Sequence, residues 1–158
     1  MSNLKLHFDV PGDDFTRAGE ASGKVKKTLK DLGFNPEVVR KTVIALYEAE
    51  INLVIHAGGG EIDVEISPEC ISMVLTDEGP GIPDVSLAMK EGYSTAPDNV
   101  RQLGFGAGMG LPNIKKYTDE RYSSDKNKKA EKKKRHRAGI IKIPSLCFFP
   151  VICFWIFR

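Results

Sequence analysis

The chain has 158 residues, the length of one ordinary domain, and it can bury a continuous core without the help of disulfides or metal ions. Its three cysteines, Cys70, Cys147 and Cys153, fit neither a disulfide framework nor a zinc ribbon. Residues 1–10 do not resemble a signal peptide, so we expect a cytoplasmic protein. Residues 1–120 carry 12 basic and 19 acidic side chains, whereas residues 121–137 carry 9 basic and 2 acidic ones. The basic side chains are therefore concentrated in one low-complexity run and not on a folded face, which argues against nucleic-acid binding.

The first third of the chain predicts one strand and two helices. Residues 4–10 alternate apolar and polar side chains, as in a half-buried strand, and Pro11 and Gly12 end the pattern with a turn. Apolar residues then recur every three or four positions over residues 13–32, which predicts an amphipathic helix capped by Gly33. Asn35 and Pro36 are typical of a helix start, and the second helix should run to residue 55, before three glycines.

The second predicted helix carries a carboxylate and an amide on one face. Glu48 and Asn52 are four residues apart and therefore lie one turn apart on a helix. An amide oxygen suits the hard ion Mg²⁺, and a neighbouring carboxylate can deprotonate a nucleophile. An isolated pair of this kind also occurs by chance on solvated helices, so the interpretation depends on the rest of the sequence.

A predicted hairpin leads to a second candidate motif. Residues 61–66 and 71–75 alternate in polarity on either side of a Ser-Pro turn, which predicts two paired strands. Asp77 follows the second strand and can accept a hydrogen bond from an exocyclic amine. Gly79 and Gly81 would let the backbone pass close to a flat base, although the same pattern is also ordinary turn chemistry.

The third candidate motif has glycine at every second position over residues 104–110. It follows a predicted short helix at residues 85–90 and a loop at residues 91–109, and it runs directly into a predicted helix that begins near Leu111. Free backbone N–H groups and the positive end of that helix would form an anion site suited to a triphosphate. The segment matches neither a Walker loop nor a Rossmann fingerprint.

In this order and spacing, the three motifs resemble the N, G1 and G2 boxes of the GHKL (Bergerat-fold) ATPases and kinases. The resemblance covers residues 4–120, and the stretches EAEINLVIHAGGGEI, DEGPGIPDVSLAMKEGYST and LGFGAGMGLPNIKK are similar to small bacterial anti-sigma factor and stressosome-switch serine/threonine kinases. The order of elements predicts an α/β two-layer sandwich. The resemblance implies a mixed, mostly antiparallel sheet with helices on one face.

The resemblance also implies a role for each motif residue. Asn52 would hold Mg²⁺, Glu48 would be the general base, and Asp77 would accept a hydrogen bond from the adenine amine of ATP. The other nucleotide contacts would come from the glycines of the base pocket and phosphate loop and from a lid over the phosphates: Gly79, Gly81, Ser94, Thr95, Gly104, Gly106, Gly108, Gly110 and Leu111.

The function implied is transfer of the γ-phosphate of ATP to a serine or threonine of a STAS-domain partner, which regulates transcription by partner switching. A sigma factor or phosphatase could be a further partner, and a homodimer is compatible with the resemblance. The alternative is a catalytically silent, nucleotide-gated module that sequesters a sigma factor or phosphatase, and the presence of Glu48 favours the kinase. A sensor histidine kinase fits less well, because about 35 residues before the second helix leave no room for a phosphoacceptor hairpin. A simple ATPase is not distinguished by the sequence.

Residues 121–158 depart from the resemblance, so we interpret residues 1–120 as the ATP-binding kinase domain and the rest as an atypical tail. Relatives continue with strands that complete the sheet around a Gly-x-Gly-Thr turn, whereas this chain has a lysine-rich run at 126–137 and then an apolar end, so the closing strands are expected to be missing. The uncharged stretch 143–157 is shorter than the roughly 20 residues that span a bilayer, so no membrane anchor is expected. A reading-frame shift between Glu120 and Ser123 would explain the tail, and the encoding DNA tests this hypothesis.

Overall fold

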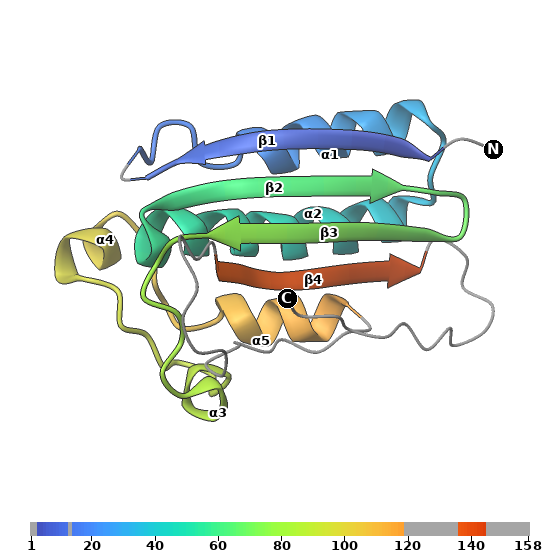
Figure 1. Cartoon of the computed structure of the whole chain (residues 1–158). Helices are drawn as coiled ribbons and strands as arrows, with labels where there is room; N and C mark the ends of the chain where they lie inside the picture. Colours follow the sequence, from blue (N-terminus) through green and yellow to red (C-terminus); the bar gives the residue numbers. More distant parts are fainter. Residues whose placement is uncertain (1–2, 13, 119–135, 145–158) are drawn as a thin grey trace.

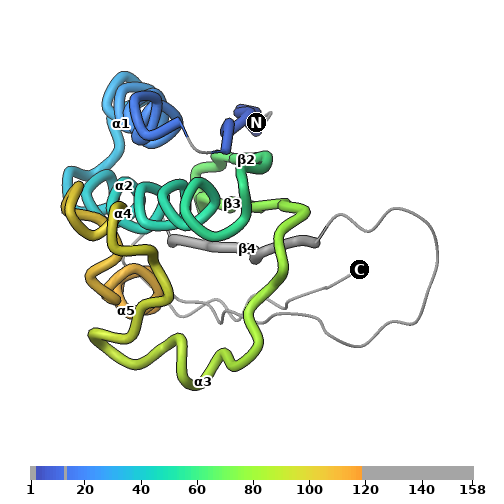
Figure 2. The backbone as a smooth tube through the Cα atoms, turned by 90° about the vertical axis from the view of Figure 1, so that its left-hand side faces the viewer, coloured from blue at the N-terminus to red at the C-terminus, as the bar shows by residue number. Residues whose placement is uncertain are grey.

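The computed structural model describes residues 3–12, 14–118 and 136–144, which form a two-layer α/β sandwich (Figure 1). A four-stranded sheet has the order β1-β2-β3-β4, and each neighbouring pair is antiparallel. Its strands are β1 (Leu4–Pro11), β2 (Gly59–Ile66), β3 (Cys70–Asp77) and β4 (His136–Pro144). Three helices, α1, α2 and α5, lie on one face of this sheet (Figure 2). The predicted fold class is therefore confirmed.

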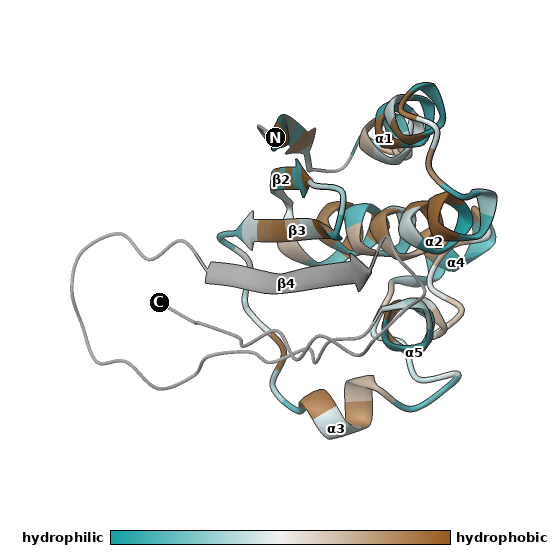
Figure 3. Cartoon of the chain, turned by 90° about the vertical axis from the view of Figure 1, so that its right-hand side faces the viewer, coloured by the Kyte–Doolittle hydropathy of each residue, from teal (hydrophilic) through white to brown (hydrophobic). Residues whose placement is uncertain are grey.

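The core lies between the sheet and the helices. The apolar residues of the predicted alternating strands face inward, and Ile62, Val64 and Met73 are each at most 1% exposed. They meet the buried faces of α1 (Glu20–Asp31) and α2 (Pro36–Asn52), and Figure 3 shows apolar segments on both helices and on β3. The alternation in the sequence thus determines which face of the hairpin carries helices.

The fourth strand corrects one sequence-based expectation. We expected the sheet to lack closing strands after residue 120, but β4 pairs with β3 from Cys70↔Pro144 to Asp77↔His136, with an irregularity between Leu75 and Thr76. The residues 140, 141 and 143 are isoleucines, which favour strands, and composition alone did not separate them from the apolar end of the tail. The rest of the tail, including the segment of the predicted reading-frame shift, lies outside the described residues.

Helix α1 begins later than predicted. The apolar period over residues 13–32 predicts a start at residue 13, but α1 runs from Glu20 to Asp31. The Asp14 carboxylate instead accepts a hydrogen bond from the Thr16 backbone N–H (3.0 Å), and Gly19 adopts a left-handed conformation (φ 92°), so the chain turns before the helix starts. The predicted end is confirmed, since Gly33 is left-handed and its N–H donates to the Lys30 carbonyl.

Helix α2 begins as predicted and ends in an unusual turn. Asn35 accepts a hydrogen bond from the Glu37 N–H at 2.8 Å and caps the helix ahead of Pro36. After Asn52 the chain continues as the π-helical turn η1 (Leu53–Ala57), which ends at the left-handed Gly58. Such turns often occur at functional sites because they re-aim the side chains around them.

Three further helices lie in the described residues after β3. Helix α3 (Val85–Ala88) lies within the predicted short helix, and α5 (Gly110–Tyr117) agrees with the predicted final helix. Helix α4 (Asp98–Gln102) lies in a segment predicted to be a continuous loop. The sequence does not predict this helix because five residues are too few to show a helical period. Among the described residues, no helix has the length and apolar character needed to cross a membrane.

Candidate functional site

The Glu48–Asn52 face of α2 lies against the start of α5. The Asn113 side-chain amide donates a hydrogen bond of 2.7 Å to Glu48 Oε1. A methyl group at Gly110 would lie 3.3 Å from both amide atoms of Asn52 and 3.4 Å from Glu48 Oε2. A side chain at this position would crowd the carboxylate and the amide, so glycine lets the start of α5 lie close to both. The structure brings two of the predicted motifs together here.

Asp77 lies at the end of β3 and is 8% exposed. Its Oδ1 accepts a hydrogen bond from the Gly79 backbone N–H (2.8 Å). A Cβ at Gly79 would be 2.7 Å from Ala57 Cα, so only glycine allows the loop after β3 to pass this close to η1. Gly81 is left-handed (φ 73°) with open space where a side chain would begin. The second motif therefore borders the turn that follows Asn52.

The glycine loop and the predicted lid are packed together. Gly108 accepts a hydrogen bond from the Gly92 N–H (3.0 Å), and a Cβ at Gly108 would be 2.4 Å from the Gly92 carbonyl carbon. A Cβ at Gly106 would be 2.4 Å from Ala96 Cβ, and Gly104, Gly106 and Gly108 all have positive φ. The loop can come this close to residues 92–96 because it carries no side chain at Gly106 and Gly108.

Within the lid, Ser94 is half-buried and its Oγ accepts a hydrogen bond from the Ala96 N–H (3.1 Å), while Thr95 is exposed. Sequence reasoning missed Arg101, whose guanidinium donates to the carbonyls of Ser94 (3.1 Å) and Ala96 (3.0 Å). Arg101 thereby fixes the segment that carries the two hydroxyl residues predicted to cover the phosphates.

The start of α5 has the properties of an anion site. No side chain caps the first turn of this eight-residue helix, and its two lysines, Lys115 and Lys116, lie in the last turn. Uncapped N–H groups and the positive end of the helix dipole favour negative charge. Leu111 packs partly against the hydrophobic core, so its predicted contact with the nucleotide stays a prediction.

The arrangement fits Mg²⁺ and a nucleotide triphosphate in its donor chemistry. The start of α5 at Gly110 lies beside an amide oxygen and a carboxylate, and no side chain caps its first turn. Mg²⁺ takes oxygen ligands and usually keeps water and phosphate oxygens in its shell, so the Asn52 amide oxygen would be one ligand among several.

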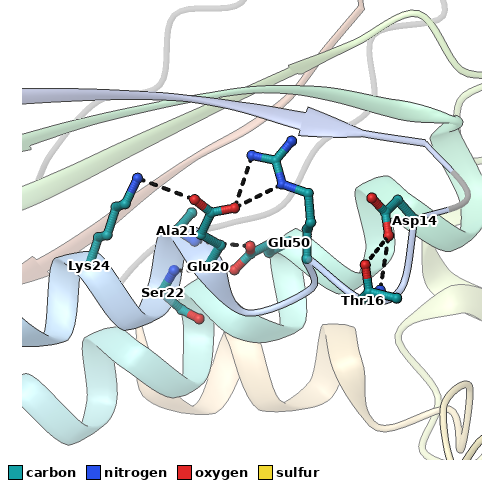
Figure 4. A network of polar contacts seen from close by, with 8 residues as sticks. Asp14, Thr16, Glu20, Ala21, Ser22, Lys24 and Glu50 are labelled. Atoms are coloured by element: carbon teal, nitrogen blue, oxygen red, sulfur yellow. Dashed lines mark hydrogen bonds and ion pairs between the residues drawn. The ribbon is translucent and has the colours of Figure 1, made fainter.

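Sequence reasoning also missed Glu50, which lies on the opposite side of α2 from Glu48. Its side chain is 2% exposed, and its two oxygens accept hydrogen bonds from the backbone N–H groups of Ala21 (3.1 Å) and Ser22 (3.2 Å) in the first turn of α1 (Figure 4). Glu50 therefore has a structural role, as the cap of α1. A cavity of about 230 Å³ beside it lies between β1 and α1 and contains none of the predicted site residues.

The comparisons with known proteins are consistent with this geometry. A family model described as "Histidine kinase-, DNA gyrase B-, and HSP90-like ATPase" matches residues 37–140, which include every predicted site residue and extend into β4. The serine/threonine-protein kinase RsbT of Bacillus subtilis (strain 168) is 31% identical over 99 residues, which cover 60% of this chain and 68% of that protein.

Proposed function

Because the chain belongs to the family of histidine kinase-, DNA gyrase B- and HSP90-like ATPases, we propose that it is an ATP-dependent serine/threonine protein kinase. The observation that carries this proposal is the close approach of the start of α5, at Gly110, to both Glu48 and Asn52. A phosphate-binding helix end beside a carboxylate is the arrangement that a phosphoryl transfer to a hydroxyl group requires. The similarity to a serine/threonine-protein kinase supports the same choice.

Nucleotide binding would involve the three motifs and the lid. The Asp77 carboxylate, which can accept several hydrogen bonds, would receive the adenine amine beside Gly79 and Gly81. Backbone N–H groups of the loop from Gly106 to Gly110 would bind the phosphates, since the Gly104 N–H already donates to the Arg101 carbonyl (3.0 Å). The Ser94–Thr95 segment would cover the phosphates. Asn52 would hold Mg²⁺, which when bound neutralises charge on the phosphates.

In the transfer step, Glu48 accepts the proton of the substrate hydroxyl group. The serine or threonine oxygen of the protein substrate forms a bond to the γ-phosphorus while the bond to the ADP oxygen breaks. The hydroxyl proton passes to the Glu48 carboxylate, and Asn113 holds that carboxylate in place. Positioning and charge neutralisation supply most of the rate enhancement in such reactions.

The protein substrate would be a STAS-domain protein of the cytoplasm. Phosphorylation of a serine or threonine adds close to two negative charges, which is enough to release a partner from a neutral interface. The kinase would then regulate transcription by a switch of partners, with a sigma factor or a phosphatase as the second partner. The acidic body of the chain is consistent with a protein partner rather than nucleic acid.

The test combines radiolabelled ATP, a purified STAS-domain protein and three variants. Asn52→Ala should lose Mg·ATP-dependent transfer, and Glu48→Gln should keep ATP binding but reduce transfer by about 10²- to 10⁴-fold, the usual value of general base catalysis. Glu20→Gln, an exposed change outside the site, is the control and should transfer at the wild-type rate. Transfer at the wild-type rate by Asn52→Ala or Glu48→Gln would refute its assigned role. ATP binding by the wild type without transfer would favour a nucleotide-gated binding module.

A further inference from the structure

We propose that Asn113 is a positioning residue that selects which oxygen of Glu48 faces the reacting hydroxyl group. The inference rests on the proposed function, because it takes Glu48 as the base. It is carried by one contact across 65 residues of sequence, the 2.7 Å hydrogen bond from the Asn113 amide nitrogen to Glu48 Oε1.

The chemistry of the pair fixes the direction of this bond. An ionised carboxylate can only accept hydrogen bonds, so the amide atom facing it must be the nitrogen. A hydrogen bond to a charged group is short and strong, which agrees with 2.7 Å between two half-buried side chains. The Glu48 side chain therefore has a fixed orientation rather than a choice of rotamers.

The two oxygens of Glu48 have different surroundings. Oε1 is bound to Asn113, whereas Oε2 lies on the Gly110 side, 3.4 Å from where a Cβ of that residue would be and beside the Asn52 amide. A hydroxyl group that enters beside the phosphates meets Oε2. Without Asn113 the carboxylate could rotate and offer either oxygen or none, and the loss of position would lower the rate of proton transfer.

The contact also links the base to the phosphate loop. Asn113 lies in the first turn of α5, where its backbone N–H donates to the Met109 carbonyl (2.9 Å) at the end of the glycine loop. When α5 is in place, the glycine loop and the Glu48 carboxylate are held by one short helical turn. We infer that the base is correctly oriented only when the loop is formed.

The test is a double-mutant cycle of Asn113→Ala with Glu48→Gln, with steady-state transfer to a purified STAS-domain protein and ATP affinity as readouts. Asn113→Ala should lower kcat by about 10- to 100-fold, because misplacement of a reacting group by an ångström costs on the order of 100-fold. The ATP dissociation constant should change by less than about twofold, because no nucleotide contact is lost. In the Glu48→Gln background the same substitution should change kcat by less than about twofold, since effects through one group are not additive.

Asn113→Asp tests through stability whether the two side chains are in contact. It places two carboxylates at the contact and should lower kcat and thermal stability together. In the Glu48→Gln background the Asp accepts a hydrogen bond from the Gln amide, and thermal stability should return.

An equal loss of kcat for Asn113→Ala in both backgrounds, or a loss of ATP affinity as large as the loss of kcat, would overturn the inference. If Glu48→Gln reduces transfer but Asn113→Ala does not, this inference alone fails. If Glu48→Gln transfers at the wild-type rate, the proposed base fails as well.

Discussion

Replacement of Glu50 should destabilise the fold strongly although the residue is outside the candidate site. Its carboxylate is 2% exposed and accepts the backbone N–H groups of Ala21 and Ser22. A hydrogen bond to a charged group contributes about 1.5–3 kcal/mol, and a buried donor left without a partner costs about as much. Glu50→Gln keeps one accepting oxygen and should lower the free energy of unfolding by about 2 kcal/mol. Glu50→Ala loses both bonds and should lower it by about 4 kcal/mol.

Equilibrium unfolding in urea, followed by circular dichroism, measures these losses. Glu20→Gln is the matched control, because it makes the same chemical change in the first turn of α1 on an exposed side chain that pairs with Arg17 and Lys24, and its effect should be much smaller. Amide hydrogen exchange at Ala21 and Ser22 should accelerate in both Glu50 variants. The reasoning fails if Glu50→Gln is as stable as Glu20→Gln, since the carboxylate would then not hold α1.

Three further predictions concern glycines and one histidine. Gly108→Ala should greatly weaken ATP binding in calorimetric titration, because its Cβ would lie 2.4 Å from the Gly92 carbonyl carbon, next to the lid. Gly104→Ala, also at positive φ but in open space, should cost only about 1–2 kcal/mol of stability, and equal effects of the two substitutions would contradict this. Gly23→Ala, exposed in α1 with open space around it, should stabilise the protein by about 0.5–1 kcal/mol in urea unfolding; a loss of stability would show strain that the structure lacks. The hydrogen bond to Asp63 holds the pKa of His7 above its usual value, helped by Asp9 and Glu61. The contribution of His7 to stability should therefore be present below about pH 6.5 and be lost as the pH rises through the raised pKa. Asp63→Asn should reduce this pH dependence, and an unchanged profile would contradict the prediction.

The parts of the fold with local chemical signals could be predicted from the sequence. Asn35 and Pro36 marked the start of α2, and alternation marked the β2–β3 hairpin. The start of α1 was predicted wrongly because the apolar period continues through residues 13–19, while the Asp14 turn and the left-handed Gly19 prevent helix formation there. A local hydrogen bond thus outweighed the periodicity.

The candidate site was predictable where its residues form motifs and not where they depend on tertiary contacts. The proximity of Gly110 to Glu48 and Asn52 followed from the family resemblance and agrees with the geometry. Asn113 could not be found, because its partner is 65 residues away and an asparagine in a helix has no distinctive pattern. Glu50 was missed for a similar reason, since a carboxylate two residues from Glu48 reads as part of a solvated face until the position of α1 is known.

Helix α2 has a mechanical consequence for any protein that binds to this chain. Within one turn, Glu48 is bonded to a side chain of α5 and Glu50 to the backbone of α1, on opposite sides. Helices α1 and α5 are therefore both hydrogen-bonded to the same turn of α2, and we expect a shift of one to displace the other through α2. We expect a binding partner that seats on α1 to alter turnover from a distance, with no need to reach the nucleotide.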